Sequence, residues 1–220
     1  MRVVIAGGHG RVALRLERVL ADRGDAPVGL IRNPEHDVDV RAAGAEPVLC
    51  DLEDARVEEV ERILIGAGAV VFAAGAGPVG GLVRMYAVDQ WALALMAEAA
   101  EKARVRRFIH ISCMGAGRRP PPESDDAWAA YVAAKSAAED NLRTRDLDWT
   151  ILRPGRLTDE RGLGLVTLAD PPLPLGEVSR DDVADVIAAL LDTPETRHRI
   201  LELIGGGIPV EEAIRLVLIR

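Results

Sequence analysis

The chain of 220 residues is poor in aromatic residues, in histidine and in cysteine. Aromatics make up only 3% of the residues, so a core has to be built from Val, Leu, Ile and Ala within the 49% hydrophobic fraction. Cys50 and Cys113 do not form a CxxC pair, and the four histidines are scattered along the chain. Neither a disulfide framework nor a metal site is therefore expected.

Positive charge is also in deficit, with 27 Lys and Arg against 35 Asp and Glu and a formal net charge of −8. Nucleic acids and anionic membrane surfaces need a basic face, so neither is an expected partner. No apolar run reaches the roughly 18 residues of a membrane-spanning helix, and the strand-like start carries no signal or transit segment. We expect a cytoplasmic protein that acts on a small molecule, and one or two local arginines could still hold a phosphate.

Strand-like apolar runs alternate with segments of helical periodicity over the first two thirds of the chain. The apolar runs cover residues 2–7, 26–32, 45–51, 69–75, 107–112 and 148–155. The helical segments cover residues 11–23, a short stretch after Pro34, 53–64, about 81–103 and about 125–145. Continuous Val and Ile runs separated by helices are typical of a parallel sheet covered on both faces. Right-handed crossovers then predict a doubly wound Rossmann sheet of the α/β class, in a single domain spanning residues 1–220.

Beyond residue 155 the pattern loosens. Residues 162–179 read as short strands and turns, and Ser179 with Asp182 predicts a capping box at the start of a helix. A last strand at 199–206 and a last helix at 210–219 follow. We expect residues 156–220 to form a small C-terminal extension on the substrate side, together with the last strand and helix.

The stretch "VVIAGGHGRVALRL", residues 3–16, passes from an apolar strand through three glycines into a helix. Gly7 permits a sharp turn, Gly10 lets the backbone approach a phosphate, and Ala13 allows the helix to pack closely on the strand. The helix N-terminus favours an anion through its free amides and its dipole. The stretch therefore predicts a cradle for a dinucleotide pyrophosphate, and the alternative is a plain glycine-rich turn.

The second strand-like run ends in "LIRNP", which places Arg32 where such folds meet the adenosine ribose. An NAD site usually has an acidic residue there, whereas a guanidinium suits the 2′-phosphate of NADP. NADP(H) is therefore favoured over NAD(H), and the alternative is a solvated arginine at a strand end.

The stretch "YVAAK" places Tyr131 and Lys135 on one face of the helix that follows the fifth strand. A free phenol has a pKa near ~10, and a nearby ammonium favours the phenolate. The pair can then act as general acid or base beside a carbonyl, and Lys135 could also hold the nicotinamide ribose. The alternative is a surface Tyr and Lys that merely share a helix face.

With both motifs present, the chain resembles the short-chain dehydrogenase/reductase superfamily. It is most similar to the atypical NAD(P)-binding group that includes flavin and biliverdin reductases and NmrA-like proteins. The resemblance extends to about residue 192 and is carried by "AGGHGRVA", "LIRNPE", "CDLED", "VFAAGAG", "VRRFIHISCMGAG", "YVAAKSAAEDNLRTRDLDWTILRPGRLTDE" and "EVSRDDVADVIAALL".

The resemblance implies a set of cofactor contacts and a set of catalytic residues. The implied cofactor contacts are Gly7, His9, Gly10, Arg11, Val12, Arg32, Asp51, Leu52, Ala73, Ala74, Gly75 and Lys135, with Pro154 and Gly155 near the nicotinamide. The catalytic candidates are Tyr131, Lys135, Ser112 and Cys113. The family's serine stands second in an "ISS", where this chain has Cys113. A thiol is a weak hydrogen-bond donor, and Ser112 next to it points to the opposite face of the strand.

Other side chains carry less specific signals. Met85, Tyr86, Met114 and Trp128 could line a substrate pocket or simply pack, and His110 in an apolar strand is expected to be a hydrogen-bonded core residue. Arg153 and Arg180 could bind an acidic substrate or form salt bridges.

The expected function is that of an NADP(H)-dependent oxidoreductase acting on a small carbonyl, quinone or flavin-like acceptor. Two alternatives stay open: a regulator that senses NAD(P) without turnover, and a sugar-nucleotide epimerase or dehydratase. Cys113 favours the regulator, and the short region after residue 156 argues against the epimerase. The oligomeric state is also open, with a homodimer as one option because exposed helices on such sheets often pair.

Overall fold

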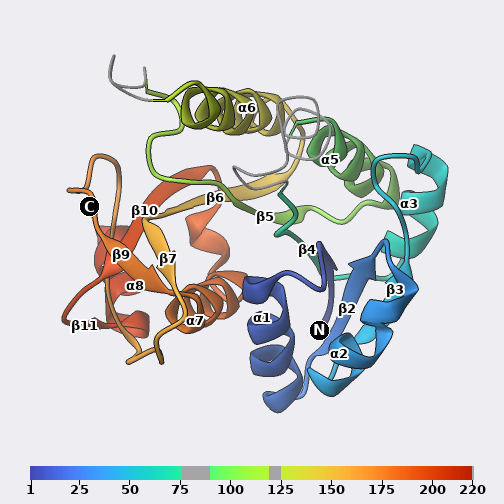
Figure 1. Cartoon of the computed structure of the whole chain (residues 1–220), viewed down its shortest axis with the longest axis horizontal. Coiled ribbons are helices and arrows are strands. Elements are labelled where there is room, and N and C mark those ends of the chain that lie inside the picture. Colours follow the sequence, from blue (N-terminus) through green and yellow to red (C-terminus); the bar gives the residue numbers. More distant parts are fainter. Residues whose placement is uncertain (76–89, 119–124, 220) are drawn as a thin grey trace.

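The computed structural model describes residues 1–75, 90–118 and 125–219 of the chain. Within them, a nine-stranded sheet has the order β11-β8-β10-β6-β5-β4-β1-β2-β3 (Figure 1). Its strands are β1 (Arg2–Ala6), β2 (Ala26–Ile31), β3 (Glu46–Leu49), β4 (Ala69–Phe72), β5 (Arg107–Ile111), β6 (Asp148–Pro154), β8 (Leu165–Ala169), β10 (Arg199–Gly205) and β11 (Ile208–Pro209). A second, parallel pair joins β7 (Arg156–Thr158) to β9 (Glu177–Ser179).

The order 3-2-1-4-5-6 of the first six strands is that of a Rossmann fold, as the sequence predicted. These strands and β10 pair in parallel. In contrast, β8 runs antiparallel to both β10 and β11. β10 and β11 run in the same direction on opposite sides of β8, an arrangement that no apolar periodicity in residues 162–210 could reveal.

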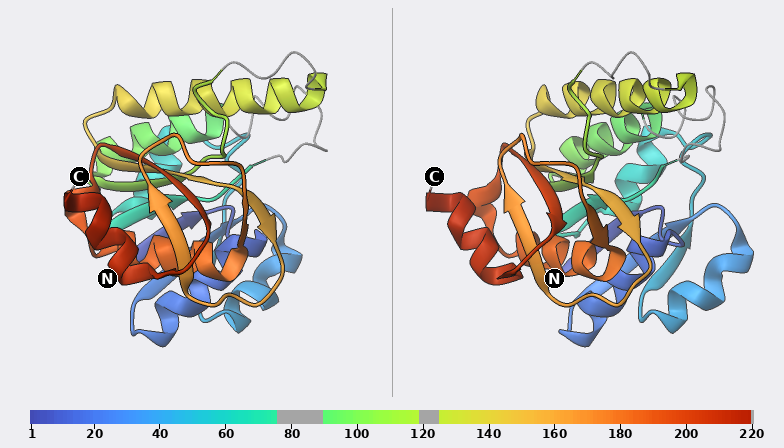
Figure 2. Two further views of the ribbon diagram at one scale, coloured as in Figure 1. Left: turned by 90° about the vertical axis from the view of Figure 1, so that its left-hand side faces the viewer. Right: turned by 60° about the vertical axis from the view of Figure 1, so that its left-hand side comes forward.

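Helices cover both faces of the sheet (Figure 2). They are α1 (Arg11–Asp22), η1 (Pro34–His36), α2 (Asp37–Ala42), α3 (Val57–Leu64), α5 (Ala92–Ala103), α6 (Asp126–Arg143), α7 (Arg180–Leu191), η3 (Pro194–Thr196) and α8 (Val210–Ile219). Among the described helices, none is both long and apolar enough to cross a membrane. The helix expected at 81–103 is described from Trp91 onward, and its earlier part lies outside the described residues.

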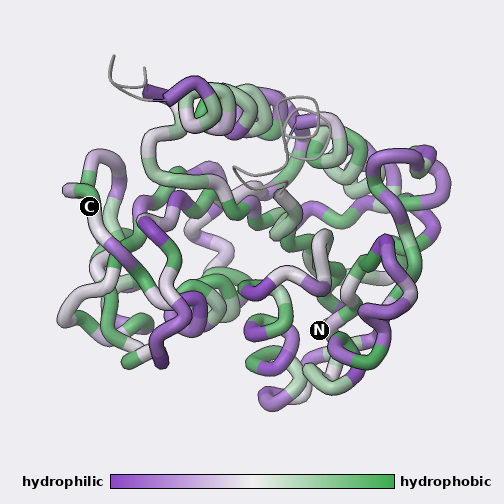
Figure 3. Tube along the Cα trace, viewed as in Figure 1, coloured by the Kyte–Doolittle hydropathy of each residue, from purple (hydrophilic) through white to green (hydrophobic). Residues whose placement is uncertain are grey.

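Alternation along the strands divides the core into two layers. Val3 and Ile5 of β1 pack with α1, α7 and α8, whereas Val4 and Ala6 pack with α3, α5 and α6. The hydrophobic stretches follow the strands through the centre of the molecule, and the most hydrophilic ones lie at its periphery (Figure 3). Burial on both faces explains why these strands read as continuous apolar runs rather than alternating ones.

The N-termini of α7 and α1 differ in how they are capped. Ser179 caps α7, its hydroxyl oxygen accepting from the backbone N–H of Asp182 at 2.9 Å, so the predicted N-cap is confirmed. In contrast, α1 begins after Gly10 with no side-chain cap and no acidic residue in its first turn. Its first backbone amides therefore have no capping side chain and no acidic residue of the first turn beside them, which leaves this helix start able to bind an anion.

One buried carboxyl interrupts the apolar packing. Glu17 of α1 is fully buried, and its carboxyl oxygens have no hydrogen-bond partner among the described residues. A Cβ atom on Gly29, in the middle of β2, would lie 2.6 Å from Glu17 Oε1. The glycine in β2 thus makes room for this carboxyl, and burial raises the pKa of Glu17 to about 8.

Candidate cofactor and active site

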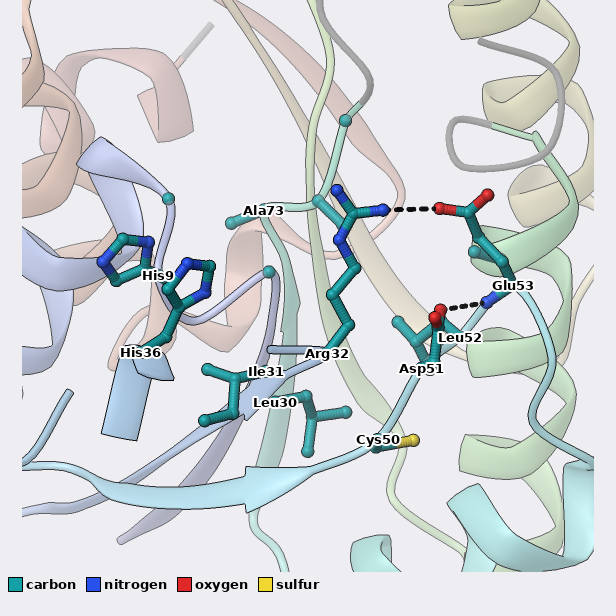
Figure 4. Close-up of a pocket in the computed structure, with 15 residues that line it drawn as sticks. His9, Leu30, Ile31, Arg32, His36, Cys50, Asp51, Leu52, Glu53 and Ala73 are labelled. Atoms are coloured by element: carbon teal, nitrogen blue, oxygen red, sulfur yellow. Dashed lines mark hydrogen bonds and ion pairs between the residues drawn. The ribbon is translucent and has the colours of Figure 1, made fainter. Parts of the chain in front are cut away.

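A cleft of about 270 Å³ opens at the carboxyl ends of β1 to β4, where the strand order reverses (Figure 4). We call it the switch-point cleft, because ligands of doubly wound sheets bind at this place. It is lined by Gly7, His9, Gly10, Leu30, Ile31, Arg32, His36, Cys50, Asp51, Leu52, Glu53, Ala73, Ala74, Gly75 and Ala92. The structure therefore brings together the predicted contacts from four separate strand ends.

The glycine turn has the geometry of a phosphate cradle. Gly7 has a φ of +77°, and a Cβ atom there would lie 2.8 Å from the Cα of Ala74. The turn is closed by a hydrogen bond of 2.8 Å from the Gly10 N–H to the Gly7 carbonyl, and it is tied to β2 by the Gly8 N–H on the Leu30 carbonyl. A Cβ atom on Gly8 would likewise lie 2.6 Å from the Cα of Gly29, so glycines let the turn pack closely on its neighbours beside the uncapped start of α1, and its geometry fits a pyrophosphate.

Arg32 lies at the mouth of the switch-point cleft, with half of its side chain exposed. Its guanidinium lies 3.0 Å from the Glu53 carboxylate, which follows β3 (Figure 4). The Asp51 carboxylate accepts from the backbone N–H of Glu53 at 3.0 Å and so shapes the turn that carries Glu53. Arg32 therefore pairs with Glu53, a neighbour that the sequence pattern did not predict.

Two histidines stack at the opposite rim. The ring centroids of His9 and His36 lie 3.6 Å apart with an interplanar angle of 10° (Figure 4). His9 Nε2 lies 2.8 Å from Asp39 Oδ2. Of this set, the sequence reasoning named His9 and missed His36. No motif marks His36, but its place just after the end of β2 is a usable signal, since parallel strands deliver such residues to the crevice.

Tyr131 and Lys135 meet on α6, beside the end of β5. The Lys135 ammonium is buried, lies 5.9 Å from the centroid of the Tyr131 ring and donates to the carbonyl of Ile111 at 3.1 Å. Tyr131 packs against Cys113, and its ring lies 5.6 Å from that of Trp128. The ammonium therefore lies within cation–π distance of the Tyr131 ring.

Ser112 and Cys113 lie in different surroundings. The Ser112 hydroxyl donates to Glu139 at 2.5 Å, and Glu139 also forms a buried ion pair with Arg153. Burial raises the pKa of the Cys113 thiol to about 11, so the side chain stays a neutral thiol. The sequence left open whether Arg153 binds an acidic substrate or forms a salt bridge, and the structure shows the salt bridge.

Other predicted residues lie away from the switch-point cleft. Arg11 and Val12 follow the glycine turn but are not part of the cleft lining, and Val12 packs on the core instead. Gly155 lies against the backbone of Gly176, where a Cβ atom would overlap the carbonyl oxygen, and Pro154 is buried in β6. The tight backbone approach explains Gly155 without a ligand.

The less specific candidates do not join the switch-point cleft either. His110 lies in the core within β5, but neither ring nitrogen has a hydrogen-bond partner among the described residues, so the expected hydrogen bonds are not found. Its pKa is lowered well below the ordinary value, first by burial and then by the charge of Lys135. Met114 is buried, whereas Met85 and Tyr86 lie outside the described residues. In the parts of the chain that the structure describes, no group of three His, Cys, Asp or Glu side chains is placed to hold a metal ion.

A Rossmann sheet with a glycine cradle and a cleft at its switch point defines a nicotinamide dinucleotide-binding protein. The chain belongs to the NAD(P)H-binding family, whose sequence pattern matches residues 7–194. This membership and the structural neighbours confirm the resemblance to the atypical short-chain reductases.

With three similar proteins, the match covers nearly the whole length of both chains. YhfK of Bacillus subtilis (strain 168), called an uncharacterized sugar epimerase, is 36% identical over 98% of this chain and 99% of its own. A Bacillus halodurans structure with the provisional name NAD-dependent epimerase/dehydratase has a TM-score of 0.90 and 33% identity, and covers 99% of this chain and 100% of its own. ChuY, an anaerobilin reductase from Escherichia coli O157:H7, has a TM-score of 0.78 and 26% identity over 93% of this chain and 97% of its own.

Proposed function

We propose that the protein is an NADP(H)-dependent oxidoreductase that reduces a small carbonyl, quinone or flavin-like acceptor. The observation that carries the proposal is the Lys135 ammonium, 5.9 Å from the Tyr131 ring centroid at the end of β5, the second strand beyond β1 in the sheet order. An acid–base pair at that edge of the sheet would stand close to a dinucleotide held in the switch-point cleft. The name of the reductase ChuY supports the same class of reaction.

The residues of the switch-point cleft fit the cofactor. Gly7 and Gly10 would hold the pyrophosphate over the start of α1, and Asp51 with Leu52 would border the adenine. When bound, the nicotinamide supplies a hydride. Ala73 and Ala74 are small enough to let a dinucleotide pass over the end of β4 toward the Tyr131 side.

The protein's own chemistry is proton transfer. Tyr131 would donate the phenolic proton to the acceptor oxygen or nitrogen, and Lys135 would stabilise the phenolate that remains. Positioned acid–base groups contribute about 10²- to 10⁴-fold to a rate. Cys113 is a weak donor in the place of the family's serine, which favours acceptors that need little polarisation, such as flavins and quinones, over simple ketones.

Preference for NADP(H) rests on Arg32. Its guanidinium is half exposed at the cleft mouth, where it could turn from Glu53 to a 2′-phosphate. The acidic neighbour opposes this preference in part, because a carboxylate 3.0 Å away already satisfies the cation and repels a phosphate.

The epimerase names of two similar proteins favour a second candidate, a sugar-nucleotide epimerase. An epimerase returns its hydride to the substrate, so it shows no net consumption of NADPH. A regulator that senses the dinucleotide would bind it and turn over nothing.

The test is an acceptor screen that follows NADPH absorbance with flavins, quinones and aldehydes, in parallel with sugar-nucleotide conversion. We expect protein-dependent NADPH loss with at least one acceptor, which Tyr131→Phe lowers by about 10²-fold without weakening NADPH binding. Asp140→Asn, at an exposed position of the same helix, is the matched control. Conversion of a sugar nucleotide without NADPH loss would favour the epimerase, and binding without any turnover would favour the sensor.

A further inference from the structure

Three arginines meet between the starts of α1 and α7, two helices that pack side by side (Figures 1 and 2). All three surround Asp159, which directly follows β7. Arg11 Nη1 lies 2.5 Å from Asp159 Oδ2, while Arg180 Nη1 and Arg15 Nη2 lie 3.0 Å and 3.4 Å from Oδ1. The proposed catalytic and cofactor roles do not use Arg15 or Arg180, and Arg11, which the family resemblance implies as a cofactor contact, lies outside the lining of the switch-point cleft.

Positive charge exceeds negative charge among these contacts. Asp159 is shared by three guanidiniums, and the second carboxylate, Asp181, pairs with Arg15 at 2.6 Å and also accepts from the Gly162 N–H. The Arg180 side chain is only 11% exposed, and its pKa is lowered first by burial and then by the charge of Arg11. Arg11 is 65% exposed and Arg15 27%, so the cluster opens to solvent, and the buried Arg180 shares its carboxylate partner Asp159 with two other guanidiniums, which points to a place for an anionic ligand.

The place of the cluster fits an acceptor rather than the adenosine half of the cofactor. Arg11 is the first residue of α1, next to Gly10 of the switch-point cleft, and the cluster reaches from there to β7 and α7, which follow β6. Arg32 lies at the other end of that cleft, beyond β2. A group bound at Arg180 would therefore lie on the β6 side of the pyrophosphate cradle.

We propose that Arg11, Arg15 and Arg180 form an anion subsite that binds the carboxylate or phosphate of an acidic acceptor. Asp159 is the internal carboxylate that this group would replace, since it pairs with all three guanidiniums and its side chain is 49% exposed. The inference rests on the proposed reductase function and names its substrate class, acceptors with a negative charge.

The test uses pairs of acceptors that differ in one anionic group: FMN and riboflavin, and 4-carboxybenzaldehyde and benzaldehyde. Binding of each is titrated to protein saturated with NADP⁺, and turnover with NADPH is measured separately. We expect at least one pair in which the acidic member binds about tenfold more tightly, as a charge-assisted contact allows. Arg180→Gln should remove the difference while the neutral member binds as before.

Two further variants allow the subsite to be tested even if Arg180→Gln unfolds. Asp159→Asn retains all three guanidiniums and should tighten the acidic member several-fold. Arg156→Gln on β7 removes an exposed charge that pairs with Glu177, and should leave the difference unchanged.

Each outcome has a defined meaning. Equal binding of acidic and neutral members, no binding of any probe, or a preference that survives Arg180→Gln would overturn the subsite. An equal loss of NADP⁺ affinity in Arg180→Gln would also overturn it, because the cluster would then serve the cofactor pyrophosphate. Acid-selective binding without turnover would support the subsite and contradict the reductase, whereas turnover without selectivity would do the reverse.

Discussion

The Arg32 guanidinium lies 3.0 Å from the Glu53 carboxylate across the mouth of the switch-point cleft. The two side chains come from the ends of β2 and β3, which are neighbours in the sheet. A 2′-phosphate would have to compete with Glu53 for the guanidinium. Under the proposed NADP(H) preference, we therefore expect the pair, and not the arginine alone, to set cofactor selectivity.

Opposite effects are expected from the two partners. Arg32→Ala should weaken NADPH by about tenfold and NADH by much less, since the lost contact is charge-assisted and specific to the phosphate. Glu53→Gln should tighten NADPH, because the repelling carboxylate is gone and Arg32 is released. Titrations followed by cofactor fluorescence measure both. A parallel loss of NADPH and NADH in Arg32→Ala, or weaker NADPH binding by Glu53→Gln, would contradict this role of the pair.

Glu17 makes the stability of the protein depend on pH. Its pKa is about 8 in the folded protein against an ordinary value of 4.5, so the folded state keeps a proton that the unfolded chain has lost. The free energy of unfolding should therefore fall as the pH rises from about 4.5 to 8, by an amount on the order of 1–4 kcal/mol.

Thermal unfolding across this pH range tests the role of Glu17. Glu17→Gln keeps the shape without the ionisation, so its melting temperature should exceed that of the wild type increasingly toward pH 8. Glu98→Gln, on the exposed face of α5, is the control. A difference in melting temperature between Glu17→Gln and wild type that stays constant at every pH would show that Glu17 has the same pKa in the folded and unfolded chains.

The Glu139–Arg153 pair should be the costliest polar contact to break. Both side chains are buried, and Ser112 adds a hydrogen bond of 2.5 Å to the same carboxylate. Arg153→Met should lower the free energy of unfolding by about 3 kcal/mol, because it leaves a buried carboxylate uncompensated. The double variant Glu139→Leu/Arg153→Met should lose less than the sum of the single changes. Additive losses in denaturant unfolding would mean that the two side chains do not stabilise each other.

The fold and the glycine turn could be predicted because their signals are local. Continuous Val and Ile runs mark strands buried on both faces, and Gly7 requires a positive φ that few other residues adopt. The contacts at Ala73 and Asp51 follow from the rule that parallel strands deliver their ends to one crevice.

Contacts between side chains of distant segments could not be predicted, because no residue spacing along the chain encodes them. Nothing in "LIRNP" indicates that Glu53 stands opposite Arg32, or that His36 stacks on His9. Glu17 lies on the apolar face of α1 by helical spacing, but nothing along the chain shows that Gly29 leaves space for its carboxyl. The antiparallel pairing of β8 likewise depends on the chain changing direction between β8 and β10, which hydrophobic periodicity does not encode.

The most direct test of the central claim is a fluorescence titration of NADPH into Gly7→Ala, with Gly66→Ala as its matched control. Both glycines have positive φ, at +77° and +78°, so both variants carry similar backbone strain. A Cβ atom at Gly7 lies 2.8 Å from the backbone of Ala74, whereas at Gly66 nothing lies within 4 Å. We predict that Gly66→Ala binds NADPH like the wild type and that folded Gly7→Ala binds it at least about tenfold more weakly. Unchanged binding by Gly7→Ala, or no binding by the wild type, would show that the glycines only make a turn.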